Sequence, residues 1–344
     1  MEDLWTYLKN ATKPIVLYGT GNGADKTLRR LGKDGVKVSG VFSSFGFKKG
    51  KIYGGFPVSD YDNLKEKLGD MIILVCFGSH LESVMENVKS LTKENELYIP
   101  DVPVLGEEIF DIGFARRNKE LLEKAYNLLA DENSKNVFYN IVMFKLTGKL
   151  EYLLKAESSR EEVFELLSLN NNESFLDLGA FVGDTVEEFI SFSNGYNSIM
   201  AVEPDKRNFK KLCENVSGYE NVKCINAAVS KIKETVLISA NHGRGNSAET
   251  KMTEIEALTI ANLCNGFKPT FIKMDIEGSE IKAIEGGKQI IKTCSPKLHI
   301  ACYHTAYDIF KIPLLVNSIN PSYKIYIRHH SCFPAWDVNC ICIK

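Results

Sequence analysis

The sequence lacks a long apolar run and a surplus of charge of either sign. Its longest apolar run, MIILVCF at residues 71–77, is far too short to span a bilayer. The opening segment, MEDLWTYLKN, is acidic early and has no apolar core, so we expect no secretory signal. Lysine and arginine number 42 against 44 aspartate and glutamate residues, which gives a net charge of −2. Because nucleic-acid binders usually carry a basic patch or stripe, we expect neither a nucleic-acid nor a membrane partner.

Paired cysteine motifs are also missing. The nine cysteines form no CxxC motif and no Cys/His ligand cluster, and an odd number cannot all pair within the chain. This pattern predicts reduced thiols in a cytoplasmic protein. The 344 residues, of which 44% are hydrophobic and 25% charged, suffice for two globular domains.

The order of apolar runs, glycine turns and helical stretches predicts an α/β protein. Residues 1–105 begin with a strand, a glycine turn, a helix and a second strand, which predicts a small Rossmann-like domain. Residues 106–173 are helical in pattern and predict a connector. In residues 174–344 strands alternate with helical stretches, IEALTIANL at 255–263 among them. This alternation predicts a doubly wound, mostly parallel sheet with an antiparallel last strand, because the last two strands lie close together.

The sequence YGTGNGADKTLRRL in the first domain looks like a nucleotide-binding loop with Gly19, Gly21 and Gly23. A dinucleotide site requires an acid at the end of the next strand to bind the ribose. This strand ends instead in VFSS, so NAD binding is unsupported. The segment is similar to small Rossmann-like domains of bacterial sugar-modifying enzymes, which in some acetyltransferases bind a nucleotide-sugar. Ser43 and Ser44 would then replace the acid. The alternative is a domain that only packs and forms a homodimer.

The clearest ligand-binding pattern is FLDLGAFVGDT at residues 175–185. An apolar strand ends there in an acid, and two glycines then let the backbone approach a ligand at a helix N-terminus. The next strand ends in VEP, where the glutamate is placed to accept hydrogen bonds from ribose hydroxyls. This pattern favours S-adenosylmethionine, which has no phosphate, over a dinucleotide. The predicted cofactor site comprises Asp177, Gly179, Ala180, Phe181, Gly183, Asp184, Thr185, Glu203 and Pro204.

The second half of the chain, about residues 174–344, resembles the FkbM family of S-adenosylmethionine-dependent methyltransferases. Five segments carry the resemblance, in the order FLDLGAFVGDT, AVEPDKRNFKKLCENV, INAAVS, PTFIKMDIEGSEIKAIEGG and PKLHIACYH. It implies a class I methyltransferase-type sheet and an activity like that of family members, which methylate hydroxyls of sugars, polyketides and other natural products. It also implies that Asp177, Gly179 and Gly183 form the cofactor loop and that Glu203 binds the ribose. Phe181 stands where many other methyltransferases have glycine, and it reduces the room beside the cofactor.

Methyl transfer to an alcohol needs a group that accepts the hydroxyl proton. Asp275 and Glu277 follow the fourth strand in FIKMDIEGSE, and His304 follows the fifth in ACYHTAY. Because the carboxyl ends of central strands form the site in a doubly wound sheet, we predict these three as catalytic residues. His304 has an unperturbed pKa of about 6.5, which suits a general base. For Asp275, the alternative is an ion pair with Lys273.

Other residues near these strand ends have simpler interpretations. Glu280 favours the positive end of a helix dipole, so we interpret it as a helix-start residue. His330 and Trp336 either line the acceptor pocket or lie in a surface loop. A divalent ion on Asp275, Glu277 and a histidine is conceivable, but no spacing demands it and none is predicted.

The sequence therefore predicts a cytoplasmic S-adenosylmethionine-dependent methyltransferase that acts on an oxygen of a sugar, a glycan precursor or another small hydroxylated metabolite. A base substrate is disfavoured, because the fourth strand continues as DIEG without the proline and aromatic residues that grip a flipped base. Two alternatives stay open. One is a nucleotide-sugar-binding module whose methyltransferase domain is inactive. The other is an NAD-dependent oxidoreductase that uses the first glycine loop.

Overall fold

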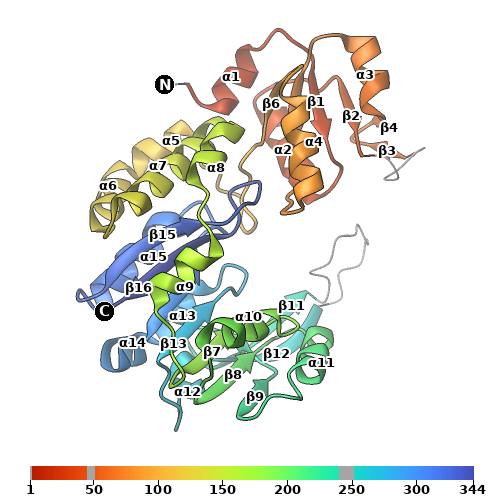
Figure 1. Ribbon diagram of the computed structural model, residues 1–344. Coiled ribbons are helices and arrows are strands. Elements are labelled where there is room, and N and C mark those ends of the chain that lie inside the picture. The colour runs from red at the N-terminus through yellow and green to blue at the C-terminus, as the bar shows by residue number, and fades with distance from the viewer. Residues whose placement is uncertain (1, 45–50, 240–251) are drawn as a thin grey trace.

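The computed structural model describes residues 2–44, 51–239 and 252–344, which form two α/β units with a group of helices between them (Figure 1). Among these residues, the first unit is a six-stranded sheet in the order β3-β4-β2-β1-β5-β6, parallel except for β3. Strands β1 and β5 are buried along their whole length, as their apolar sequences predict. The elements are α1 (Leu4–Asn10), β1 (Ile15–Tyr18), α2 (Asn22–Lys33), β2 (Gly40–Phe42), β3 (Ile52–Tyr53), β4 (Phe56–Ser59), α3 (Tyr61–Leu68), β5 (Ile72–Val75), α4 (Glu82–Leu91) and β6 (Glu96–Tyr98).

Five helices in residues 112–167 connect the two units. They are α5 (Ile112–Arg117), α6 (Lys119–Leu128), α7 (Glu132–Thr147), α8 (Leu150–Ala156) and α9 (Arg160–Leu167). Leu129 and Glu157, in the segments between them, form isolated parallel bridges with the edge strand β15 (Lys324–His329) of the second unit. The connector thereby covers backbone groups that an edge strand would otherwise expose. No helix in the described ranges has the length and hydropathy that crossing a bilayer requires.

The second unit contains the predicted doubly wound sheet, seven described strands in the order β15-β16-β14-β13-β7-β8-β9. The strands are parallel except for β16, which runs antiparallel to both neighbours. The strand order reverses between β7 and β13, and ligands bind beyond the carboxyl ends of strands at such a point. The elements are β7 (Ser174–Leu178), α10 (Asp184–Ser193), β8 (Ser198–Val202), α11 (Lys206–Asn215), β9 (Val222–Ile225), β10 (Ala228–Val229), β11 (Glu234–Ser239), β12 (Met252–Leu258), α12 (Ile260–Leu263), β13 (Phe271–Met274), α13 (Glu280–Gly286), α14 (Lys288–Cys294), β14 (Lys297–Ala301), α15 (Asp308–Ile319), β15 (Lys324–His329) and β16 (Val338–Ile343).

The helix predicted for residues 255–263 is largely wrong. Strand β12 pairs antiparallel with β11 and parallel with β10 in a small three-stranded sheet, and helix α12 follows as a single turn. Ile255 and Ala257 are buried while Glu254 and Glu256 are exposed, so the local period is two. Thr259 then begins the helix with a capping box. Pairing with β11 decides the conformation of a short apolar run that fits either structure.

The two units contact each other through loops that follow strands. Ser79, after β5, and Phe333, after β15, exchange two backbone hydrogen bonds of 2.8 and 3.1 Å. Trp336 packs on Gly78 so closely that a Cβ there would lie 2.1 Å from its ring. Trp336 therefore belongs to the contact between the units, which is neither of the two places that the sequence suggested for it.

Candidate active site

The loop after β7 is the first part of the predicted cofactor site. Gly179 has a φ of +86°, and a Cβ there would lie 1.9 Å from the carbonyl oxygen of Asp275, so glycine is required. The N–H groups of Gly179 and Ala180 donate to the carbonyl of Val202 at 2.9 and 3.0 Å. Gly183, with a φ of +96°, is the N-cap of α10. The loop is thus fixed between the ends of β8 and β13.

Glu203, which follows β8, holds the same loop. One carboxylate oxygen accepts the N–H of Phe181 at 2.9 Å, and the other accepts the N–H of Asp205 at 2.8 Å. Burial raises the pKa of Glu203, and these backbone hydrogen bonds oppose that effect. A carboxylate has about four acceptor positions, so positions remain for the hydroxyls of a ligand. Phe181 has a φ of +46°, and its side chain is 51% exposed.

Asp177 lies beneath the loop. Its carboxylate is fully buried, accepts a hydrogen bond from the hydroxyl of Thr185 and lies 4.0 Å from Nζ of Lys273. Burial raises the pKa of Asp177, while Lys273 and Thr185 act in the opposite direction. Lys273 therefore forms its ion pair with Asp177, and the alternative pair with Asp275 is wrong.

A cavity of about 580 Å³ joins the cofactor loop to the end of β13. This volume is in the range of small-molecule sites. The predicted residues that line it are Gly179, Phe181, Asp184, Thr185, Glu203, Pro204, Asp275 and Glu277. Lys282 in α13 also lines it, and no sequence motif had singled it out. Asp177, Ala180 and Gly183 shape the loop from behind without lining the cavity.

The three predicted catalytic residues come together at the end of β13, along with Glu280. Nε2 of His304 lies 3.4 Å from Oδ1 of Asp275 and 3.5 Å from Oε2 of Glu277. On the other side of the ring, Nδ1 lies 3.2 Å from Oε1 of Glu280. The ring is buried, whereas the side chains of Asp275 and Glu277 are 37% and 60% exposed. Glu277 has a left-handed φ of +53°, a strained conformation that often marks functional sites.

The interpretation of Glu280 as a helix-start residue is incomplete. Glu280 is the first residue of α13, but it is 1% exposed, and its Oε1 also accepts the N–H of Ile276 at 2.9 Å. Burial would raise the pKa of Glu280, but His304 and backbone hydrogen bonds together lower that pKa. An acid at the start of a helix fits both roles, so the sequence carried no signal that its side chain turns inward to a histidine 24 residues later.

His304 does not have the pKa on which its predicted role as a general base depended. Burial alone would lower the pKa of His304, but Glu280 and then Asp275 and Glu277 raise it to about 9. With this pKa, the imidazole keeps its proton at neutral pH. The backbone of His304 is fixed as well, because its carbonyl accepts the N–H of Leu105 at 2.8 Å from the segment after the first unit.

The second predicted loop lies in the first unit. Gly19 has a φ of +111°, Gly21 is the N-cap of α2, and a Cβ at Gly23 would lie 2.5 Å from the carbonyl just after β5. Ser44, the suggested substitute for an acid, hydrogen-bonds with the hydroxyl of Tyr18. Gly19 and Gly23 thus allow α2 to pack closely on the end of β5, and none of the three glycines lines the two cavities described here.

His330 is buried, and its Nδ1 lies 3.1 Å from the carbonyl of Ser158 in the connector. It does not line the cavity beside Asp275. The acceptor-pocket and surface-loop interpretations of His330 are therefore both replaced by packing against the connector.

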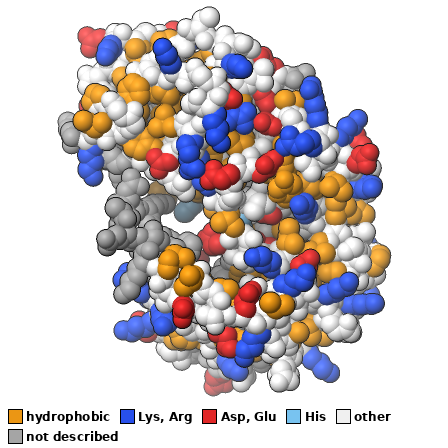
Figure 2. All heavy atoms as spheres, turned by 180° about the vertical axis from the view of Figure 1, so that it is seen from behind, with side chains coloured by type: hydrophobic (Ala, Val, Ile, Leu, Met, Phe, Trp, Pro, Cys, Tyr) orange, Lys and Arg blue, Asp and Glu red, His pale blue; other side chains and the backbone are white. Residues whose placement is uncertain are grey.

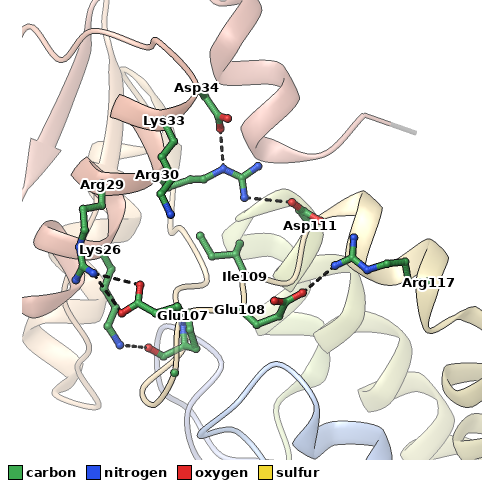
Figure 3. A pocket seen from close by; sticks show the side chains of 12 residues that line it. Lys26, Arg29, Arg30, Lys33, Asp34, Glu107, Glu108, Ile109, Asp111 and Arg117 are labelled. Carbon is green, nitrogen blue, oxygen red and sulfur yellow. Dashed lines mark hydrogen bonds and ion pairs between the residues drawn. The ribbon is translucent and has the colours of Figure 1, made fainter.

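A smaller cavity of about 290 Å³ lies between α2 and the segment that leads into α5 (Figure 3). The ion pairs across it are Arg29–Glu107, Arg30–Asp111 and Arg117–Glu108. Lys26 donates to the carbonyls of Pro103 and Val104. Because most of the cations that line it already face partners, the cavity fits a joint between the first unit and the connector better than an anion site. Acidic and basic side chains are also interspersed over the face shown in Figure 2.

Comparison with protein families identifies the segment that holds this site. The family model described as the methyltransferase FkbM domain matches residues 177–324. That segment includes the loop after β7, Glu203 and the cluster around His304. The predicted resemblance is thereby confirmed for these residues. Comparison with curated proteins gives no match.

A solved structure shares the fold. A methyltransferase FkbM from Methylobacillus flagellatus KT has 22% sequence identity and a TM-score of 0.73, and the match covers 96% of this chain and 90% of that one. It therefore matches the fold of both units, including the class I methyltransferase-type sheet. A precorrin-6y C5,15-methyltransferase from Geobacter metallireducens GS-15 has 12% identity and a TM-score of 0.35, over 53% of this chain and 84% of that one.

Proposed function

We propose that this chain, whose residues 177–324 match the methyltransferase FkbM domain, transfers a methyl group from S-adenosylmethionine to a hydroxyl oxygen. The acceptor would be a sugar, a glycan precursor or another small hydroxylated metabolite. The observation that supports this most is the continuous cavity that joins the loop after β7 and Glu203 to the carboxylates of Asp275 and Glu277.

The residues at one end of the cavity fit S-adenosylmethionine. When bound, the cofactor supplies a methyl group on a sulfonium, which an oxygen nucleophile can displace. Glu203 would accept hydrogen bonds from the ribose hydroxyls with the lone pairs that two backbone N–H groups leave free. The exposed carboxylate of Asp184, in the first turn of α10, suits the cofactor's ammonium group. The absence of a Cβ at Gly179 keeps the loop against β13.

The residues at the other end fit a hydroxylated acceptor. Asp275 and Glu277 present exposed carboxylates to the cavity as hydrogen-bond acceptors, and Lys282 adds a donor. A molecule with several hydroxyls can therefore both donate to and accept from the residues of this end. Asp275 would accept the hydroxyl proton as the new carbon–oxygen bond forms. His304, protonated and buried beneath, would hold the two carboxylates in position. Its role is positioning rather than proton abstraction.

Calorimetry with S-adenosylmethionine tests the cofactor assignment. Glu203→Gln should weaken binding ten- to a hundredfold, because hydrogen bonds to a charged acceptor contribute about 1.5–3 kcal/mol. The matched control is Glu214→Gln on α11, an exposed residue near Lys210, which should leave affinity unchanged. No binding by the wild-type chain, or equal affinity in Glu203→Gln, would overturn the assignment.

A screen over sugars and nucleotide-sugars, with S-adenosylhomocysteine as the measured product, tests the reaction. Asp275→Asn should lower turnover at least a hundredfold, because removing a proton acceptor typically costs about 10²–10⁴ in rate. Binding of S-adenosylmethionine should persist in this variant. Full turnover in Asp275→Asn would contradict the role of Asp275, whereas turnover on base substrates alone would contradict the acceptor class.

A further inference from the structure

The cluster around His304 has a feature that the proposed methyl transfer leaves unused. With the residues that the structure describes, neither ring nitrogen of this buried histidine makes a hydrogen bond of acceptable geometry, although three carboxylates lie within 3.2–3.5 Å. Nε2 lies within 3.5 Å of carboxylate oxygens of Asp275 and Glu277, two residues that line the cavity. A buried nitrogen without an aligned partner is costly, and its position among oxygen ligands needs an explanation.

We propose that Nε2 of His304, Asp275 and Glu277 bind a divalent metal ion, with Glu280 holding the opposite side of the imidazole. Nε2 lies 3.4 Å from the nearer oxygen of Asp275 and 3.5 Å from that of Glu277. Two ligand atoms that each lie about 2.1 Å from one ion are about 3.0 Å apart at a right angle and about 3.4 Å apart at the tetrahedral angle. Each of the two distances from Nε2 thus suits a shared ion and is long for a direct hydrogen bond, and the exposed side chain of Glu277 can turn to bring its oxygen closer to that of Asp275.

Glu280 lies where a metal-bound histidine usually has its outer carboxylate. Such a histidine donates its second N–H to a carboxylate or carbonyl, which fixes the tautomer and the ring orientation. Oε1 of Glu280 faces Nδ1 at 3.2 Å and is itself fixed by the N–H of Ile276. The N–H of Leu105 restrains the backbone of the same histidine. The ring is therefore held in the orientation that directs Nε2 to the two exposed carboxylates.

The charges around the cluster also favour a cation. Three carboxylates surround one imidazole, and the nearby Lys273 is engaged with Asp177. A proton on the ring would balance one of these negative charges, whereas a divalent ion in its place would balance two. One imidazole with two carboxylates is a ligand set that suits Mn²⁺ and Zn²⁺ better than Ca²⁺, which prefers oxygen alone.

The proposed ion would lie where the acceptor hydroxyl is expected. A metal-bound hydroxyl loses its proton more readily, so the ion would make the acceptor hydroxyl easier to deprotonate. This consequence rests on the proposed function. The binding of the ion does not, because its ligands belong to the chain alone.

Binding of Mn²⁺ alone, without cofactor or acceptor, tests the site. The chain is treated with a chelator and titrated with Mn²⁺, and free Mn²⁺ is measured by electron paramagnetic resonance. We expect one bound ion per chain. Glu277→Gln and Glu280→Gln should each weaken binding at least tenfold, the first by loss of a ligand and the second by loss of the outer carboxylate. Glu277 is 60% exposed, so its substitution leaves the core intact.

Glu285→Gln is the matched control, because this residue lies in the same helix and pairs with Lys231 outside the cluster. Its affinity for Mn²⁺ should equal that of the wild type. Electron spin echo measurements should show a nitrogen nucleus coupled directly to the bound ion. No stoichiometric binding, equal loss in Glu285→Gln, or a bound ion without nitrogen coupling would each overturn the proposal. Calorimetry with S-adenosylmethionine on the same samples separates this failure from a failure of the methyltransferase assignment.

Discussion

Replacing Gly179 by alanine tests the close packing that joins the cofactor loop to the reaction centre. A Cβ at this position would lie 1.9 Å from the carbonyl oxygen of Asp275 and 2.8 Å from its carbonyl carbon. That carbonyl cannot yield easily, because the N–H of Asp275 donates to Leu178 at 3.0 Å in the ladder between β13 and β7. The substitution must therefore separate the ends of two central strands.

Two other glycines divide the expected cost into its parts. At Gly218 a Cβ would meet no atom within 4 Å, and the residue has no left-handed φ, so Gly218→Ala should change the free energy of unfolding by about 0.5 kcal/mol or less. Gly266 is equally open but has a φ of +82°, so Gly266→Ala should cost about 1–2 kcal/mol for the backbone conformation alone. Gly179→Ala adds overpacking of about 1–3 kcal/mol to the same conformational cost. We expect a total loss of about 2–5 kcal/mol.

Urea unfolding followed by far-ultraviolet circular dichroism measures the three variants. The free energy of unfolding should be highest for Gly218→Ala, lower for Gly266→Ala and lowest for Gly179→Ala. At temperatures where Gly179→Ala is still folded, it should have lost affinity for S-adenosylmethionine while the two others keep it. If Gly179→Ala is no less stable than Gly266→Ala, the contact with β13 does not have the importance that we give it.

Two further predictions concern buried ionisable groups. Lys145 and Asp101 form an ion pair of 3.0 Å with side chains 3% and 7% exposed, so Lys145→Met should cost about 3–5 kcal/mol in urea unfolding. The double variant Lys145→Met/Asp101→Leu should recover most of this loss, and a double variant as unstable as the single one would contradict the explanation. Burial lowers the pKa of His329 to about 4, so the unfolded chain binds a proton near pH 6.5 that the folded chain resists. The free energy of unfolding should therefore fall as the pH drops from 7 to 5. His329→Leu should remove about 2 kcal/mol of this fall. If the free energy of unfolding depends on pH equally in the wild type and in His329→Leu, the explanation is wrong.

The sequence predicts where the loop after β7 and Glu203 lie in the fold, because the determinants of their positions are local. Asp177 is the next-to-last residue of β7, and Glu203 and Asp275 directly follow β8 and β13; parallel strands bring their carboxyl ends to one edge of a sheet. Gly179 and Gly183 mark the turn between strand and helix, and both have the positive φ that such a turn requires. Neighbouring residues and one topological rule therefore suffice.

The environment of His304 could not be predicted in the same way. The three acids that raise its pKa lie in another segment, and their side-chain directions depend on the left-handed turn at Glu277 and on the inward rotation of Glu280. Strand β12 was missed for a related reason, since its pairing with β11 is a tertiary event. In both cases, the sequence supplied the groups while long-range packing decided what they contact.

The first unit influences the reaction centre through the segment that leaves it, rather than through its glycine loop. Leu105 follows β6, donates its N–H to the carbonyl of His304 and has its side chain against Gly278, where a Cβ would lie 2.6 Å from it. Gly278 in turn has a φ of +85° and directly follows Glu277. A movement of the first unit relative to the sheet would therefore displace both the histidine and the turn that carries a carboxylate. The ion pairs between α2 and the segment that leads into α5 hold this segment in place (Figure 3). The first unit and the connector therefore form part of the scaffold that positions His304 and Glu277.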